Sequence, residues 1–233
     1  MSRKTCAIIG FGAGLGAAYA KTFHEAGYKL ALLSRSGAEF SGARTDINAK
    51  SYSCDAADPN NLKAVLDAVE RDLGHIDVVI YNADLASFGT LKEVTEDQFE
   101  KSWRVGALGL FAAAKLLAPR MSERGSGSII VSGATASLRG NIWTTAFAPT
   151  KAAQRILAQS LAKQLGPKGV HVAYIVIDGV IDTADTRENF APNEPDEFFI
   201  DPNGIAEAAL TVVNQKRSAW TFEIDLRPFG EKW

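Results

Sequence analysis

The sequence has few of the residues that mark specialised protein classes. Two cysteines and three histidines are scattered singly among 233 residues, so neither a disulfide framework nor a zinc site is expected. No apolar run approaches the ~20 residues of a membrane-spanning helix, and the first residues lack the apolar segment and cleavage site of a signal peptide. We therefore expect a cytoplasmic protein with no metal and no membrane partner.

An excess of positive charge is also absent. Lys and Arg number 25 against 27 Asp and Glu, a formal net charge of −2, so a nucleic-acid partner is not expected. Hydrophobic residues make up 46% and charged residues 22%, a composition that excludes disorder as the main state. The length fits one globular domain over residues 1–233.

Short apolar runs alternate with helical patterns along most of the chain. Several runs are continuously apolar, as in parallel strands covered on both faces. Asp-Pro pairs at 58–59 and 201–202 mark helix starts, and a capping-box pattern of Thr95 and Gln98 precedes a long helical segment, Phe99–Arg120. The alternation predicts an α/β fold, a Rossmann-type, doubly wound, mainly parallel seven-stranded sheet with helices on both faces. The strands are expected at Thr5–Gly10, Lys29–Ser34, Ala49–Cys54, Ile76–Tyr81, Gly127–Ser132, Val170–Ile177 and Thr221–Leu226.

A glycine-rich turn follows the first expected strand. It contains Gly10, Gly12, Gly14 and Gly16, with Leu15 at the start of a helical segment. Glycines let the backbone approach a pyrophosphate, and a helix N-terminus offers free N–H groups to that anion. Placed between a strand and a helix, the turn indicates a dinucleotide site.

Several motifs together resemble the short-chain dehydrogenase/reductase family. Gly10, Gly14 and Gly16 form its GxxxGxG pattern, and the resemblance extends from end to end of the chain. It implies an oxidoreductase that uses NAD or NADP and forms homodimers or homotetramers. The other matching residues are Asp55 with Ala56 at the adenine contact, Asn82-Ala83 of an Asn-Asn-Ala-Gly element, Lys151 of Tyr-x-x-x-Lys, and Gly179, Ile181 and Thr183 of Pro-Gly-x-x-x-Thr.

The end of the second strand bears on the choice of dinucleotide. NAD enzymes place an acidic residue there, which bonds the ribose 2′-OH. This chain has Ser34 followed by Arg35. A guanidinium suits a 2′-phosphate, so NADP is the expected cofactor and NAD the alternative.

The proton-transfer positions depart from the family pattern. The resemblance implies that Tyr exchanges a proton, Ser holds the substrate oxygen, Lys binds the nicotinamide ribose, and Asn on the long helix supports a water relay. Counting from Lys151, the Tyr and Ser positions hold Phe147 and Ala134, and Gly106 stands at the Asn position. General acid–base catalysis is typically worth ~10²–10⁴ in rate, so the sequence predicts that the ordinary proton chemistry is lost.

Two carboxylates on the same rim are candidate replacements. Asp84 follows Asn82-Ala83 where the family has Gly, and Asp178 precedes Gly179 where it has Pro. Each is a candidate acid or substrate-binding group, and the alternative is that both are solvated loop carboxylates. A threonine hydroxyl, such as that of Thr135, can position a carbonyl but is a poor acid, so it suits only the role of the family Ser.

Aromatic residues are expected to build the substrate pocket. A lid-like segment over residues 183–200 contributes some of them, which favours an apolar or aromatic substrate; packing of the lid or a subunit contact is the alternative. The expected walls are Trp143, Phe147, Phe190, Phe198 and Phe199.

Two functions remain open at this point. The first is an NADP-dependent oxidoreductase for a small carbonyl or alcohol, with a non-standard proton donor or none. The second is a catalytically silent dinucleotide-binding protein, a cofactor sensor or partner subunit, motivated by Phe147, Ala134 and Gly106. Subunit contacts through a last edge strand, Trp220 to Leu226, are compatible with either.

Overall fold

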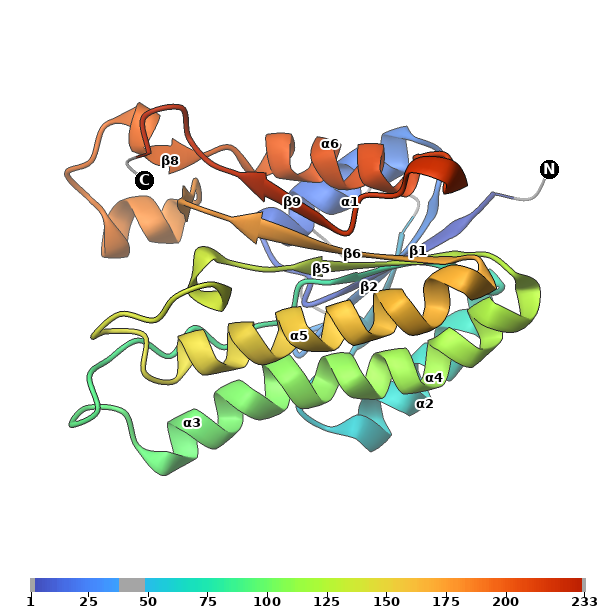
Figure 1. Ribbon diagram of the computed structural model, residues 1–233, viewed down its shortest axis with the longest axis horizontal. Helices are drawn as coiled ribbons and strands as arrows, with labels where there is room; N and C mark the ends of the chain where they lie inside the picture. Colours follow the sequence, from blue (N-terminus) through green and yellow to red (C-terminus); the bar gives the residue numbers. More distant parts are fainter. Residues whose placement is uncertain (1–2, 38–48, 232–233) are drawn as a thin grey trace.

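A parallel sheet of seven strands forms the middle layer of the molecule (Figure 1). The computed structural model describes residues 3–37 and 49–231. The strand order is β3-β2-β1-β4-β5-β6-β9, with β9 at one edge, so the predicted fold is confirmed. The strands are β1 (Thr5–Ile9), β2 (Lys29–Ser34), β3 (Ala49–Ser53), β4 (Ile76–Tyr81), β5 (Gly127–Ser132), β6 (Val170–Ile177) and β9 (Glu223–Leu226).

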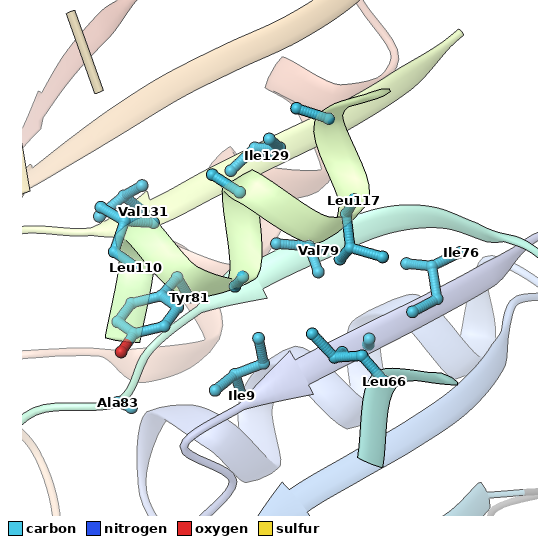
Figure 2. Packing of buried hydrophobic residues seen from close by; sticks show 14 of the residues in the cluster. Ile9, Leu66, Ile76, Val79, Tyr81, Ala83, Leu110, Leu117, Ile129 and Val131 are labelled. Atoms are coloured by element: carbon cyan, nitrogen blue, oxygen red, sulfur yellow. The ribbon is translucent and has the colours of Figure 1, made fainter. Parts of the chain in front are cut away.

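Helices cover both faces of this sheet (Figure 1). α1 (Leu15–Glu25) and α6 (Pro202–Val213) pack on one face, and α2 (Pro59–Leu73), α4 (Gly109–Arg124) and α5 (Phe147–Leu165) pack on the other. Successive strand residues such as Ile8 and Ile9 enter opposite cores, because side chains alternate across a strand. Figure 2 shows Leu66 and Leu117 closing over β1 and β4. Each such buried side chain contributes about 1.5–3 kcal/mol.

The predicted helix starts are confirmed. The Asp58 carboxylate accepts hydrogen bonds from two backbone N–H groups at the start of α2, and Asp201 accepts one, from the Asn203 N–H, at the start of α6. Thr95 and Gln98 form the capping box of α3 (Glu96–Trp103). Short helical turns complete the chain: η1 (Arg104–Leu108), η2 (Thr135–Ser137), η3 (Gly166–Lys168), η4 (Thr186–Phe190), η5 (Asp196–Phe198) and η6 (Arg217–Ala219).

The long helical segment is not regular, unlike the pattern expected over Phe99–Arg120. α3 continues through a π-helical turn, η1, into α4. Gly106 lies in this turn, where the Gln154 side-chain amide donates to its carbonyl oxygen (3.0 Å). A side chain at position 106 would place its Cβ 2.2 Å from Thr150 Cγ2. The absent side chain lets α5 pack directly on the backbone of this turn.

The segment after β6 is held by ion pairs. β7 (Val180–Ile181) pairs with β8 (Phe199–Ile200) as a separate parallel ladder. Arg187 bonds Asp182 at 2.6 Å and Asp196 at 2.7 Å, and its guanidinium lies 4.4 Å from the centre of the Phe199 ring. None of the helices in the described ranges is long and apolar enough to cross a membrane.

Candidate functional site

A cleft of about 810 Å³ opens at the carboxyl ends of β1 to β4. Ligands bind at this end of parallel α/β sheets. The cleft collects loop residues that follow each of these strands, so residues far apart in the sequence meet in one place. The predicted residues that line it are Gly10, Ser34, Arg35, Asp55, Ala56, Asn82, Ala83 and Asp84.

Close packing explains two glycines of the first loop. Gly10 has a φ of +86°, and a Cβ there would lie 2.4 Å from the backbone of Ala83. At Gly14 a Cβ would lie 2.7 Å from the methyl group of Thr183, so the loop touches the start of the lid-like segment. At Gly12, in contrast, a Cβ would have no described atom within 4 Å. The loop leads into α1 at Leu15 and Gly16.

The start of α1 is open to an anion. Among the described residues, no side chain caps this helix at Gly14. Its first N–H groups are therefore left for a ligand or water. The loop itself is tied to β4, because the Asn82 side-chain amide donates to the Gly10 carbonyl oxygen (3.0 Å).

The end of β2 holds a buried hydroxyl. Ser34 is only 9% exposed, and its Oγ has no hydrogen-bond partner among the described residues. Buried polar atoms are usually paired, so an unpaired hydroxyl in the cleft wall fits a ligand group there. Arg35 follows on the exposed side of the cleft. Asp55, at the end of β3, accepts a bond from the Ala57 N–H (2.9 Å) beside buried Ala56.

A second, apolar pocket of about 390 Å³ adjoins the cleft. Asn82 and Asp84 line both cavities. The predicted residues that line the pocket also include Leu15, Ala134, Phe147, Lys151, Gly179, Ile181 and Phe190.

Three phenylalanine rings, with Phe88 in contact with the other two, form one wall of this pocket. Phe88 lies 4.9 Å from Phe147 and 6.0 Å from Phe190, measured between ring centres. Phe88 was not predicted, because it lies beyond the Asn82-Ala83 motif in the loop after β4. Three other aromatic residues predicted as pocket walls do not belong to the described lining, so that prediction is wrong for Trp143, Phe198 and Phe199. Trp143 is 53% exposed at the surface, and Phe198 packs against the buried ring of Phe199.

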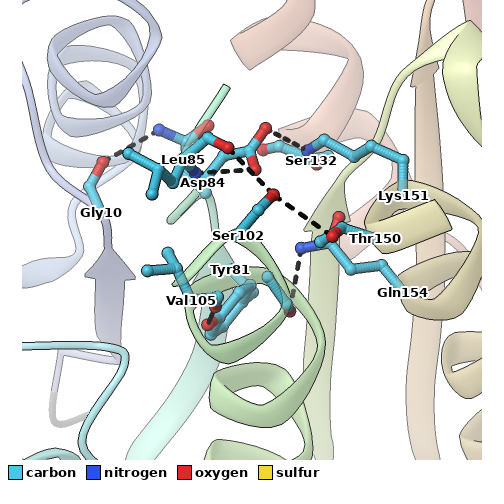
Figure 3. Close-up of polar contacts among 12 residues, drawn as sticks. Gly10, Tyr81, Asp84, Leu85, Ser102, Val105, Ser132, Thr150, Lys151 and Gln154 are labelled. Carbon is cyan, nitrogen blue, oxygen red and sulfur yellow. Dashed lines mark hydrogen bonds and ion pairs between the residues drawn. The ribbon is translucent and has the colours of Figure 1, made fainter. Parts of the chain in front are cut away.

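Lys151 and Asp84 form a buried ion pair where the two cavities meet (Figure 3). Lys151 is 4% exposed, and its Nζ lies 3.1 Å from Asp84 Oδ2. The same ammonium donates to the Ser132 carbonyl oxygen (3.0 Å) and lies 5.6 Å from the centre of the Phe147 ring. Asp84 Oδ1 accepts from the Leu85 N–H (2.8 Å). Asp84 is therefore not a solvated loop carboxylate.

Asp178 and Thr135 bind one another instead of facing either cavity. The Thr135 hydroxyl donates to Asp178 Oδ1 at 2.5 Å, and Arg227 lies 3.5 Å from Oδ2. Neither residue belongs to the described lining of the cleft or the pocket. The structure thus separates these two candidates from Asp84, and it also shows that Asp178 is not a solvated carboxylate.

Ala134 and Gly106, at the Ser and Asn positions of the family pattern, offer no side-chain hydrogen-bonding group. Ser132, at the end of β5, lines the pocket, and its hydroxyl shares a 3.0 Å hydrogen bond with the Tyr19 phenol. Burial raises the pKa of Tyr19 above its usual range. Sequence reasoning missed this pair, because the motif points to Ala134.

Polar side chains from α3 and α5 meet beneath Asp84 (Figure 3). Ser102 donates to the Leu85 carbonyl oxygen (3.1 Å) and lies 3.2 Å from the Thr150 hydroxyl. Thr150 thereby occupies the space that a side chain at Gly106 would need. The described residues include no group of His, Cys, Asp or Glu that could hold a metal ion.

Comparisons with known proteins agree with this architecture. The family model for short chain dehydrogenases matches residues 4–194. An uncharacterized oxidoreductase of Staphylococcus aureus (strain USA300) is 28% identical over 231 residues, which is 98% of each chain. The crystal structure of a short-chain dehydrogenase from Rhodopseudomonas palustris has 30% identity and a TM-score of 0.82, covering 97% of this chain and 99% of that one. An alcohol dehydrogenase from the archaeon Thermococcus sibiricus, complexed with 5-hydroxy-NADP, shares the fold with a TM-score of 0.85, 24% identity and 99% coverage of both chains.

Proposed function

This chain belongs to the short-chain dehydrogenase family, and we propose that it is an NADP-dependent oxidoreductase for a small substrate held in the apolar pocket. One observation carries the proposal: the cleft and the pocket share Asn82 and Asp84, beside a buried lysine. A dinucleotide in the cleft and a substrate in the pocket would meet at that point.

The residues that would hold the dinucleotide follow from their places in the cleft. The N–H groups at the start of α1 suit the pyrophosphate, and Asp55 with Ala56 suits the adenine end. The unpaired Ser34 hydroxyl and the Arg35 guanidinium suit a 2′-phosphate. Lys151 would bond the nicotinamide ribose. When bound, the dinucleotide supplies or accepts a hydride.

The pocket accounts for the size and character of the substrate. Its phenylalanine and aliphatic walls favour an apolar body, with Asp84 and Lys151 as the polar groups at one end. Phe147 and Ala134 have no hydroxyl, so neither holds nor protonates a substrate oxygen. A carbonyl, an alcohol or the corresponding nitrogen compound fits this description.

A fluorescence titration with NADPH and NADH tests the cofactor. We expect saturable NADPH binding, weakened about 10–100-fold by Arg35→Gln with NADH unaffected, because a charge-assisted bond contributes about 1.5–3 kcal/mol. Arg139→Gln, outside the described cleft lining, is the matched control. If wild-type protein shows no saturable binding of either dinucleotide, the proposal is wrong.

A turnover panel separates the enzyme from a silent dinucleotide-binding protein. The panel offers carbonyl and imine compounds with NADPH and follows its oxidation. Steady turnover that Lys151→Met abolishes excludes the silent protein. NADPH binding without any turnover would favour it.

A further inference from the structure

Two phenylalanine rings of the pocket wall are accessible to a ligand in the pocket. Phe88 is 49% exposed and Phe190 is 58% exposed, and the Phe88 ring contacts both Phe147 and Phe190. The face of an aromatic ring carries partial negative charge and attracts cations. Lys151 already lies over the Phe147 ring. Three adjoining rings thus favour an organic cation as well as an apolar group.

Asp84 adds a formal negative charge to the same lining. Its oxygens accept one bond from the Leu85 N–H and one from Lys151. A carboxylate offers about four acceptor positions, so it can accept a further bond from a ligand. The ion pair with Lys151 fixes the carboxylate without using its full capacity.

Hydrogen-bond donors in the pocket are mostly engaged. The Asn82 amide donates to Gly10, and the Thr186 hydroxyl donates to the Ile181 carbonyl oxygen (2.6 Å). Ser132 shares its bond with Tyr19, and Lys151 directs two of its three N–H groups to Ser132 and Asp84. A carbonyl becomes an alkoxide when it accepts a hydride, and that charge needs a donor. The pocket therefore suits an electrophile that brings its own proton.

We infer that the pocket binds apolar organic cations, and that the bond reduced there is a protonated C=N bond of a cyclic or aryl imine. The inference rests on the proposed function. In the reduction, a hydride from the reduced dinucleotide forms a C–H bond at the iminium carbon. The C=N π pair becomes the nitrogen lone pair, the dinucleotide leaves oxidised, and the product is a neutral amine. No proton is transferred, so the absence of hydroxyls at Phe147 and Ala134 costs nothing.

Two ligands that differ in one atom test the binding part of this inference. Tetrahydroisoquinoline is cationic at neutral pH, and isochroman has oxygen in place of its nitrogen. Calorimetry on the protein, alone and with NADP⁺, is expected to show the amine binding about 10–100-fold more tightly. Equal affinities, or a preference for isochroman, would overturn the inference.

Asp84→Asn is expected to remove most of that preference, because it keeps the shape and deletes the charge. Asp178→Asn is the matched control, since that carboxylate is held by Thr135 and Arg227 outside the described pocket lining. A preference that survives Asp84→Asn unchanged would contradict the assignment of the cation site to this carboxylate.

Turnover with matched electrophiles tests the chemical part. We expect NADPH to reduce dihydroisoquinoline at least about tenfold faster than α-tetralone, the ketone of the same fused-ring skeleton. Faster reduction of α-tetralone would contradict the inference while leaving the proposed function intact. Absence of NADPH binding in the titration would contradict the proposed function. The comparison of tetrahydroisoquinoline with isochroman would still test whether the pocket prefers a cation.

Discussion

The cofactor cleft and the apolar pocket share one rim but are built by different means. The cleft depends on backbone: Gly10 and Gly14 are held against Ala83 and Thr183 with no room for a side chain. The pocket depends on side chains from separate loops, and its family hydroxyls are replaced by Phe147 and Ala134. Main-chain geometry tolerates little change without loss of the fold, whereas pocket side chains can be exchanged. We therefore expect substitutions in the glycine loop to be more harmful to the fold than substitutions in the pocket wall.

The ion pair at the rim belongs to both halves. Lys151 lines the pocket, and its partner Asp84 lines both the pocket and the cleft. Removing Asp84 leaves the buried charge of Lys151 uncompensated, which is strongly unfavourable. This ion pair therefore couples the cleft to the pocket.

The largest expected effect comes from Gly10→Ala. Its positive φ costs about 1–3 kcal/mol for another residue, and the contact with the Ala83 backbone adds about 1–3 kcal/mol of overpacking. We expect a large fall in melting temperature and loss of NADPH binding. Gly12→Ala, in open space within the same loop, should leave both nearly unchanged. Equal effects of the two variants would contradict the packing account of the cleft.

The next effect is a gain of activity. Phe147→Tyr combined with Ala134→Ser restores the family hydroxyls, and the reduction of α-tetralone should rise by about 10²–10⁴ if the pocket still aligns the substrate. Initial rates of NADPH oxidation measure it, with each single variant as control. No gain, in protein that binds NADPH normally, would show that the pocket differs from the family in shape as well as in its hydroxyls.

A third prediction concerns the π-helical turn beneath the rim. Gly106→Ala should destabilise the fold by about 1–3 kcal/mol through contact with the Thr150 methyl group. Thr150→Ser removes that methyl and keeps the hydroxyl that donates to the Ala146 carbonyl oxygen. The two changes together should therefore be less harmful than their sum. Additive losses in a double-mutant cycle by urea unfolding would disprove the contact.

The smallest effect lies far from the rim, at His171 on β6. Burial lowers the pKa of this ring from its ordinary value of 6.5, while Nε2–H donates to Thr221 and the ring stacks 4.6 Å from Trp220. The unfolded chain takes up a proton more readily, so stability is present above that value and falls as the pH drops below it. His171→Gln should flatten the acid limb of unfolding free energy against pH.

Much of the fold could be predicted because it follows local rules. Continuously apolar strands, Asp-Pro helix starts and the Thr95–Gln98 capping box all appear in the structure as expected. The π-helical turn was missed, since it depends on Thr150 and Gln154 from another helix.

The candidate site was only partly predictable for the same reason. Asp84 and Asp178 look equivalent in the sequence, but the first pairs with Lys151 and the second with Thr135 and Arg227. The contribution of Phe88 to the pocket also depends on tertiary contacts. These partners come from segments far apart in the sequence, so neither periodicity nor motif spacing predicts which side chains meet.

The central claim is that the cleft and the pocket form one hydride-transfer site that works without the family hydroxyls. The most direct test uses NADPH deuterated at the transferring position, with dihydroisoquinoline and α-tetralone offered together, and mass spectrometry of the products. We expect deuterium on the carbon of the amine product, and none when Lys151→Met protein is used. If NADPH binds and neither product carries deuterium, the claim is contradicted.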